Sequence, residues 1–156
     1  MKQVVNIYEK GQRGLKALNT LGAYLYKSPV EQSLLNLIYY RVSQLNGCAF
    51  CLDMHAKDLL ANGENVQRLL VLDAWKETNF YSDRERAALA FAEALTKLNG
   101  PIDEAIHNET LQHFTEEEMI DLSFAVIAIN GYNRVNIAFM QPEVVGTYTP
   151  GMFQNA

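Results

Sequence analysis

The sequence contains little cysteine: only two residues among 156, and both lie in one short segment, LNGCAFCLDMHAK, at positions 45–57. This scarcity excludes a disulfide-rich secreted scaffold, which needs several bridges. A run of about 18 apolar residues is also missing, so no membrane span is expected. The start of the chain shows no apolar stretch of signal-peptide length. These absences favour a cytoplasmic protein, in which clustered cysteines more often serve catalysis or metal binding than structure.

Positive charge is in short supply as well. The 13 Lys and Arg residues are outnumbered by 18 Asp and Glu residues, which gives a net charge of -5. We therefore expect neither nucleic acid nor an anionic membrane as a partner. Hydrophobic residues make up 49% of the chain, which is typical of a globular protein. A chain of this length is most simply a single domain spanning residues 1–156.

The alternation of polar and apolar residues that is typical of strands is absent, and helical patterns run along the whole chain. We expect an all-α, single-domain bundle of about six to seven helices. Three capping boxes, which begin at Ser28, Ser82 and Thr115, predict helix starts. The expected helices cover roughly residues 7–26, 29–46, 48–61, 65–77, 83–98, 103–113 and 116–140. The last is apolar nearly all round, which predicts burial or contact with another subunit.

Cys48, Cys51 and His55 are spaced so that they share one face of the expected helix. Cys48 lies in the first turn, where the free N–H groups and the helix dipole favour a thiolate. Cys51 and His55 form an i,i+4 pair, which brings a base near the second sulfur. The spacing therefore predicts reactive thiols but leaves open which cysteine is the more acidic.

A permanent structural bridge is disfavoured, and three other interpretations of this cluster compete. A permanent structural bridge would close a tiny loop and stabilise little. It would also be strained, because Cβ atoms at i,i+3 in a helix lie farther apart than a relaxed disulfide allows. A dithiol that cycles to a disulfide, assisted by a base, is therefore favoured. A zinc site that stabilises the fold or a partner interface is the alternative, although a fourth ligand is not evident. Two inert, buried cysteines are the third possibility.

The segment RVSQLNGCAFCLDMHAKD resembles the active-site segment of alkylhydroperoxidase D-like proteins, within the carboxymuconolactone decarboxylase superfamily. The similarity continues through later segments and covers about residues 28–140. The resemblance implies an all-helical fold, homo-oligomers such as trimers or hexamers, and a thiol peroxidase that needs no metal or haem cofactor. Its partners would be a hydroperoxide substrate and an external dithiol reductant. The family's decarboxylases typically lack the cysteine pair, so decarboxylation is not expected.

The resemblance also implies roles for the three residues. Cys51 matches the thiolate that attacks the peroxide, Cys48 the resolving thiol, and His55 a member of a proton relay. The sequence departs from the family at one position. The family usually has a glutamate twelve residues before the first cysteine, whereas this chain has Asn36 there, and an asparagine cannot take up a proton. A histidine often found between the cysteines is also missing. Both changes favour an alternative function, dithiol–disulfide exchange with little peroxidase activity.

Other polar residues are candidates for the surroundings of the thiols. Asn36 and Tyr40 could line the thiol pocket or join the relay, and core packing is the alternative for both. Four polar residues interrupt the apolar last helix: Asn130, Asn133, Arg134 and Asn136. For these we favour structural pairing or a subunit contact over direct catalysis.

Overall fold

The structure, a computed structural model, describes residues 5–140 and 142–152. Within these ranges all regular structure is helical, which confirms the prediction of an all-α fold. The α-helices are α1 (Ile7–Lys10), α2 (Gln12–Leu25), α3 (Gln32–Asn46), α4 (Ala49–Ala61), α5 (Val66–Leu70), α6 (Asp83–Lys97), α7 (Glu104–His113) and α8 (Glu116–Phe139), and the 3-10 helices are η1 (Leu72–Glu77) and η2 (Pro142–Val144).

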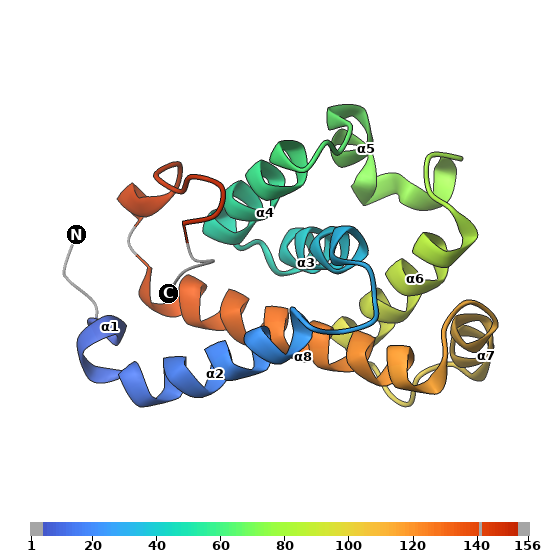
Figure 1. The fold of residues 1–156 in the computed structure, drawn as a ribbon, viewed down its shortest axis with the longest axis horizontal. Helices are drawn as coiled ribbons and strands as arrows, with labels where there is room; N and C mark the ends of the chain where they lie inside the picture. Colours follow the sequence, from blue (N-terminus) through green and yellow to red (C-terminus); the bar gives the residue numbers. More distant parts are fainter. Residues whose placement is uncertain (1–4, 141, 153–156) are drawn as a thin grey trace.

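Helix α3 lies in the middle of the bundle, and α4, α6 and α8 pack around it (Figure 1). Its apolar residues reach both clusters of the core. Leu35, Ile38 and Val42 join residues of α6 and α8 in the larger cluster. Leu37 joins the smaller cluster, which includes Leu59 of α4. Because α3 is apolar on most of its surface, it can hold α4 and α8 at the same time, and the candidate site lies between these two helices.

Two of the three expected capping boxes are confirmed. Ser82 starts α6 and Thr115 starts α8, each with the reciprocal pair of hydrogen bonds to a glutamate three residues later. The box expected at Ser28 is wrong, because α3 begins only at Gln32 and its N-cap is Glu31. The Ser28 hydroxyl instead donates to Asp121 of α8 and accepts from the backbone of Val30. Tertiary contact with α8 therefore replaces the local cap.

Two expected helices are divided. The segment expected at 7–26 is split at Gly11 into α1 and α2, and the segment expected at 65–77 becomes α5 and η1. The second break lies at Val71, whose φ of -104° and ψ of 6° leave the helical range. The turn after it buries Leu72 and Trp75 in the smaller core cluster. Helix propensity describes single residues and their neighbours in the chain, so it could not predict a break that depends on the burial of these large side chains.

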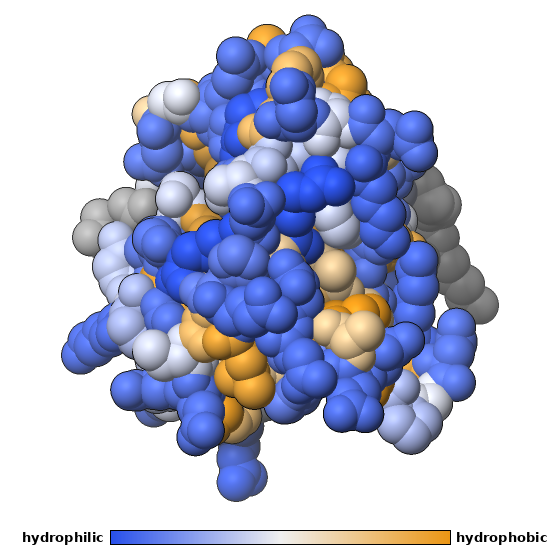
Figure 2. Space-filling model, turned by 90° about the vertical axis from the view of Figure 1, so that its right-hand side faces the viewer, coloured by the Kyte–Doolittle hydropathy of each residue, from blue (hydrophilic) through white to orange (hydrophobic). Residues whose placement is uncertain are grey.

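The surface seen from the α6 and α7 side of Figure 1 is mostly hydrophilic, with apolar patches that are separate from one another (Figure 2). Exposed apolar residues also occur along α8, where Ile120, Phe124 and Ile127 follow a helical spacing. None of the helices among the described residues is both long enough and apolar enough to cross a bilayer.

Candidate redox site

The turn between α3 and α4 positions the first cysteine. Gly47 adopts a left-handed conformation with φ of 68°, which favours glycine, and it ends α3. The backbone N–H of Gly47 then donates to Gln44, and that of Cys48 donates to Ser43. These bonds form the typical helix-ending motif and reverse the chain within two residues. Cys48 is therefore the N-cap of α4, one position before the place expected from the sequence.

Cys48 and Cys51 are joined by a disulfide bond in this structure. Their Cα atoms lie 5.4 Å apart, within the ordinary range for a bridge. The sequence argument placed both residues inside the helix, whereas Cys48 is its N-cap and has an extended backbone with φ of -85° and ψ of 97°. Each cysteine is only 1% exposed, so the bridge lies beneath the surface.

The start of α4 provides a favourable electrostatic environment for a thiolate. No side chain caps the helix, although Cys48 occupies the N-cap position. The N–H groups of the first turn are therefore not capped by a side chain. Cys48 thus lies at a helix end, as the sequence argument for a Cys48 thiolate requires, and its acidity stays a prediction.

His55 follows Cys51 by one turn of α4 and is buried, with 7% of its surface exposed. Its ring lies against the ring of Tyr39 on α3. Neither ring nitrogen has a hydrogen-bond partner among the residues that the structure describes. Burial lowers the pKa of His55 to about 4. The imidazole is therefore neutral at pH 7 and supplies no positive charge to a neighbouring thiolate.

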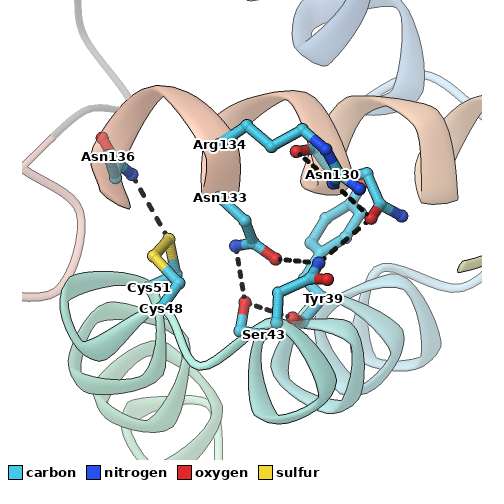
Figure 3. The surroundings of a disulfide bond; sticks show 9 residues. Tyr39, Ser43, Cys48, Cys51, Asn130, Asn133, Arg134 and Asn136 are labelled. Carbon is cyan, nitrogen blue, oxygen red and sulfur yellow. Dashed lines mark hydrogen bonds between the residues drawn. A yellow bond between two sulfur atoms is a disulfide. The ribbon is translucent and has the colours of Figure 1, made fainter. Parts of the chain in front are cut away.

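Helix α8 provides a donor that the sequence analysis did not assign to the site. The side-chain amide of Asn136 donates to Sγ of Cys51 over 3.3 Å (Figure 3). One turn earlier, Asn133 is fully buried and donates to the hydroxyl of Ser43. Asn46 donates to both Asn130 and Asn133. The asparagines that interrupt the apolar last helix were the signal in the sequence, and from them we expected structural pairing or a subunit contact.

The two remaining candidates lie on α3. Tyr40 packs against the smaller core cluster, with Leu37 and Leu59 among its members, so this contact matches the core-packing alternative. Tyr39, not Tyr40, is the tyrosine that contacts His55. Asn36 is half-buried and forms no hydrogen bond to His55. The structure thus brings Cys48, Cys51 and His55 together at the start of α4. Asn36 and Tyr40 lie on α3, and neither makes a polar contact to the three residues.

The segment after α8 folds back onto α4. Lys57 pairs with Asp53 and donates to the backbone carbonyls of Gly146 and Tyr148. The Tyr148 hydroxyl donates to Asp58, and the residue is 4% exposed. Burial, together with the neighbouring carboxylate of Asp58, raises the pKa of Tyr148 to about 12. This C-terminal segment is therefore held against α4, the helix that contains Cys51.

Metal ligation has no preformed site among the residues described. No group of three or more His, Cys, Asp or Glu side chains in residues 5–140 and 142–152 is placed to hold a metal ion. With the two sulfurs bonded to each other, the thiolates that the zinc interpretation needs are not present in this state. The geometry at hand is that of an oxidised dithiol.

Comparison with known proteins agrees with this description. The family model for the carboxymuconolactone decarboxylase family matches residues 12–94. The uncharacterized protein YdfG of Bacillus subtilis (strain 168) is 38% identical over 139 residues, which cover 88% of this chain and 95% of YdfG.

Two solved structures share the fold. One is a protein of unknown function from Agrobacterium tumefaciens, described as a candidate antioxidant defence protein AhpD, with a TM-score of 0.85 and 32% identity over 90% of this chain and 97% of the other. The other is a peroxidase-related protein with an alkylhydroperoxidase AhpD core from Ralstonia eutropha JMP134, with a TM-score of 0.73 and 18% identity over 88% and 77% of the two chains. The chain therefore belongs to the carboxymuconolactone decarboxylase family, as an alkylhydroperoxidase D-like member.

Proposed function

We propose that the protein is a thiol-dependent peroxidase that reduces hydroperoxides through a cycle between the dithiol and disulfide forms of Cys48 and Cys51. The single observation that carries the proposal is the bonded pair of sulfurs at the start of α4, with His55 one turn further along the same helix. Membership of the alkylhydroperoxidase D-like group supports it. The Agrobacterium protein, at 32% identity, is described as a candidate antioxidant defence protein AhpD.

The reaction would proceed in two steps. The Cys51 thiolate attacks one oxygen of the hydroperoxide, so that an S–O bond forms, the O–O bond breaks and the alkoxide leaves with a proton as an alcohol. Cys48 then attacks the sulfenic acid of Cys51, so that the S–S bond forms and water leaves. The peroxide is reduced and the two cysteines are oxidised. An external dithiol restores the pair by exchange and is itself oxidised to a disulfide.

Several further parts of the proposal follow from this chemistry. The cycle needs a reducing partner, so we assign the protein to a compartment rich in dithiols, such as the cytoplasm.

The protein would work as a homo-oligomer, and the exposed apolar residues Ile120, Phe124 and Ile127 of α8 support a contact between copies. No metal or haem takes part in the steps as written. The neutral His55 would hand a proton between the thiol and the leaving oxygen, since an imidazole has both a donor and an acceptor.

Intact mass after peroxide treatment tests the proposal. Reduced protein, freed of reductant and exposed to a stoichiometric hydroperoxide, should lose two hydrogen atoms as the disulfide forms. The Cys48→Ser variant should instead gain one oxygen, because a sulfenic acid on Cys51 would have no partner. Unchanged mass for the native protein, while an external dithiol exchanges with it readily, would replace the peroxidase with a dithiol–disulfide oxidoreductase.

That dithiol–disulfide oxidoreductase is the second candidate, favoured by the amide at Asn36 and by the low pKa of His55. Both leave the site without a carboxylate-assisted base.

Metal analysis addresses the third alternative, a zinc-binding structural protein. Reduced protein purified without chelator should contain no stoichiometric zinc. Zinc at one equivalent, lost in the Cys48→Ser variant, would overturn the redox proposal.

A further inference from the structure

We propose that Asn136 stabilises the thiolate of Cys51 in the reduced protein, and that it thereby sets both the acidity of this thiol and the redox equilibrium of the pair. The inference rests on the proposed dithiol cycle and adds a residue of α8 to it. Asn136 lies beyond residues 12–94, the part of the chain that the family model matches. No role is assigned to it by that match.

One contact is the starting point. Nδ2 of Asn136 lies 3.3 Å from Sγ of Cys51 and donates to it (Figure 3). A disulfide sulfur is a weak acceptor, whereas a thiolate is charged and accepts a much stronger hydrogen bond. The same N–H therefore stabilises the reduced, ionised cysteine more than the oxidised one. A donor held at this sulfur shifts the balance toward the thiolate without any change in the fold.

The other groups near Cys51 do not provide this stabilisation. His55 is buried without polar partners and is neutral at pH 7. Within the described part of the chain, no Lys or Arg side chain donates a hydrogen bond to either sulfur. Lys57, the cation of α4, is occupied by Asp53 and two carbonyls. The free N–H groups at the start of α4 lie closest to Cys48, its N-cap. The amide of Asn136 is thus the side-chain donor directed at Cys51.

A second set of hydrogen bonds holds Asn136 in place. Asn133, one turn earlier on α8, donates to Ser43 over 3.0 Å and accepts from Asn46 over 2.9 Å. Both partners lie at the end of α3, directly before the turn that leads to Cys48. Because Asn133 has no exposed surface, these bonds fix α8 against that turn. Asn136 is on the same side of α8 and therefore lies over the bridge between Cys48 and Cys51.

The contact matters most when the disulfide is reduced. The thiolate of an external dithiol attacks Sγ of Cys48, a new S–S bond forms, and the bond between Cys48 and Cys51 breaks. The electron pair of the broken bond stays on Cys51, whose thiolate accepts the hydrogen bond of Asn136. The second thiol of the reductant then displaces Cys48, which takes up a proton, and the reductant leaves as a disulfide. Asn136 stabilises the leaving thiolate, and a better leaving group departs faster.

The test measures the acidity of Cys51 in the Cys48→Ser background, where it is the only thiol. The ultraviolet absorbance of the thiolate is followed against pH in two variants. Asn136→Leu keeps the branched side chain of four heavy atoms and has no donor, and Asn136→Asp keeps the shape and adds negative charge. We expect the proton affinity of Cys51 to rise about tenfold in the Leu variant, as for loss of a hydrogen bond to a charged acceptor, and more in the Asp variant. Asn108→Leu, the same change on the exposed face of α7, should have no effect.

A second measurement uses both cysteines. Equilibrium with a reference dithiol should shift about tenfold toward the disulfide in Asn136→Leu, because the reduced state loses its stabilisation. Identical acidity and redox equilibrium in native protein, Asn136→Leu and Asn136→Asp would overturn the inference. Both measurements use no peroxide, so they stand apart from the peroxidase test. A protein that fails to react with peroxide could still show the effect of Asn136, and the converse also holds.

Discussion

The imidazole of His55 lies against the ring of Tyr39, with ring centroids 5.3 Å apart and an angle of 43° between the planes. One residue comes from α4 and the other from α3, so the contact joins the two helices beside the disulfide. An aromatic ring covers the histidine but cannot satisfy its nitrogens. The histidine that the sequence marks as a base is therefore kept neutral by its surroundings.

Stability at acid pH should depend on His55. Its pKa falls from 6.5 to about 4 on folding, so the folded state resists a proton that the unfolded chain accepts. The resulting stabilisation is complete above pH 6.5 and is lost as the pH falls toward about 4, with a total of about 3 kcal/mol. Denaturant unfolding of the oxidised protein at a series of pH values measures it. His55→Phe should lack this part of the pH dependence, and an identical slope in both proteins would contradict the buried neutral state.

Returning a carboxylate should raise peroxidase activity. Asn36 lies one turn before Tyr39 on α3, and a glutamate there could accept a proton and attract one onto His55. We expect Asn36→Glu to increase the rate of hydroperoxide consumption about tenfold or more, since general base catalysis typically contributes about 100-fold to 10,000-fold. Asn36→Gln should leave the rate unchanged. Steady-state turnover with a dithiol reductant is the measurement. An equal rate in all three proteins, each correctly folded, would mean that the base is supplied elsewhere.

Loss of Arg41 should destabilise the fold more than loss of an ordinary surface charge. The Arg41 guanidinium is buried and pairs with Glu93 over 2.8 Å, and Glu93 also accepts from the indole of Trp75. Burial alone would raise the pKa of Glu93, but the hydrogen bonds from Trp75 and Arg41 lower it overall. Arg41→Met removes the closer of the two cations at this carboxylate and leaves only Lys76, 3.7 Å away and largely exposed, so the cost should be about 3 kcal/mol. Urea unfolding measures the change, with the exposed Arg13→Met as control, and a cost below that of the control would refute it.

The C-terminal segment should loosen at high pH. Because the pKa of Tyr148 is raised to about 12, the folded state keeps its proton while the unfolded chain loses it above pH 10. The contribution of Tyr148 is therefore complete below pH 10 and is lost as the pH rises through about 12. Tyr148→Phe should lose about 1 kcal/mol at neutral pH, where its hydrogen bond to Asp58 is missing. Between pH 10 and 12, the free energy of unfolding of Tyr148→Phe should fall less steeply with pH than that of the native protein. Denaturant unfolding at a series of pH values measures both, and equal slopes would contradict a buried, protonated Tyr148.

Sequence patterns identified most of the helices because their signals are local. The boxes at Ser82 and Thr115 satisfy orphan N–H groups with side chains only three residues away, so no distant contact is needed. The Ser28 box had the same pattern and was wrong, because Asp121, 93 residues away, competes for the hydroxyl. Local rules fail where a side chain finds a stronger partner across the core.

The sequence by itself determined the all-helical fold, the grouping of Cys48, Cys51 and His55 at one helix start, and the family, because periodicity and motif spacing are properties of the chain. The tertiary structure decided the chemical environment of these residues. It buried His55 without a partner and brought Asn136 to Cys51 from 85 residues away. Desolvation and long-range hydrogen bonds depend on how α3, α4 and α8 pack, and no spacing within a single helix encodes them.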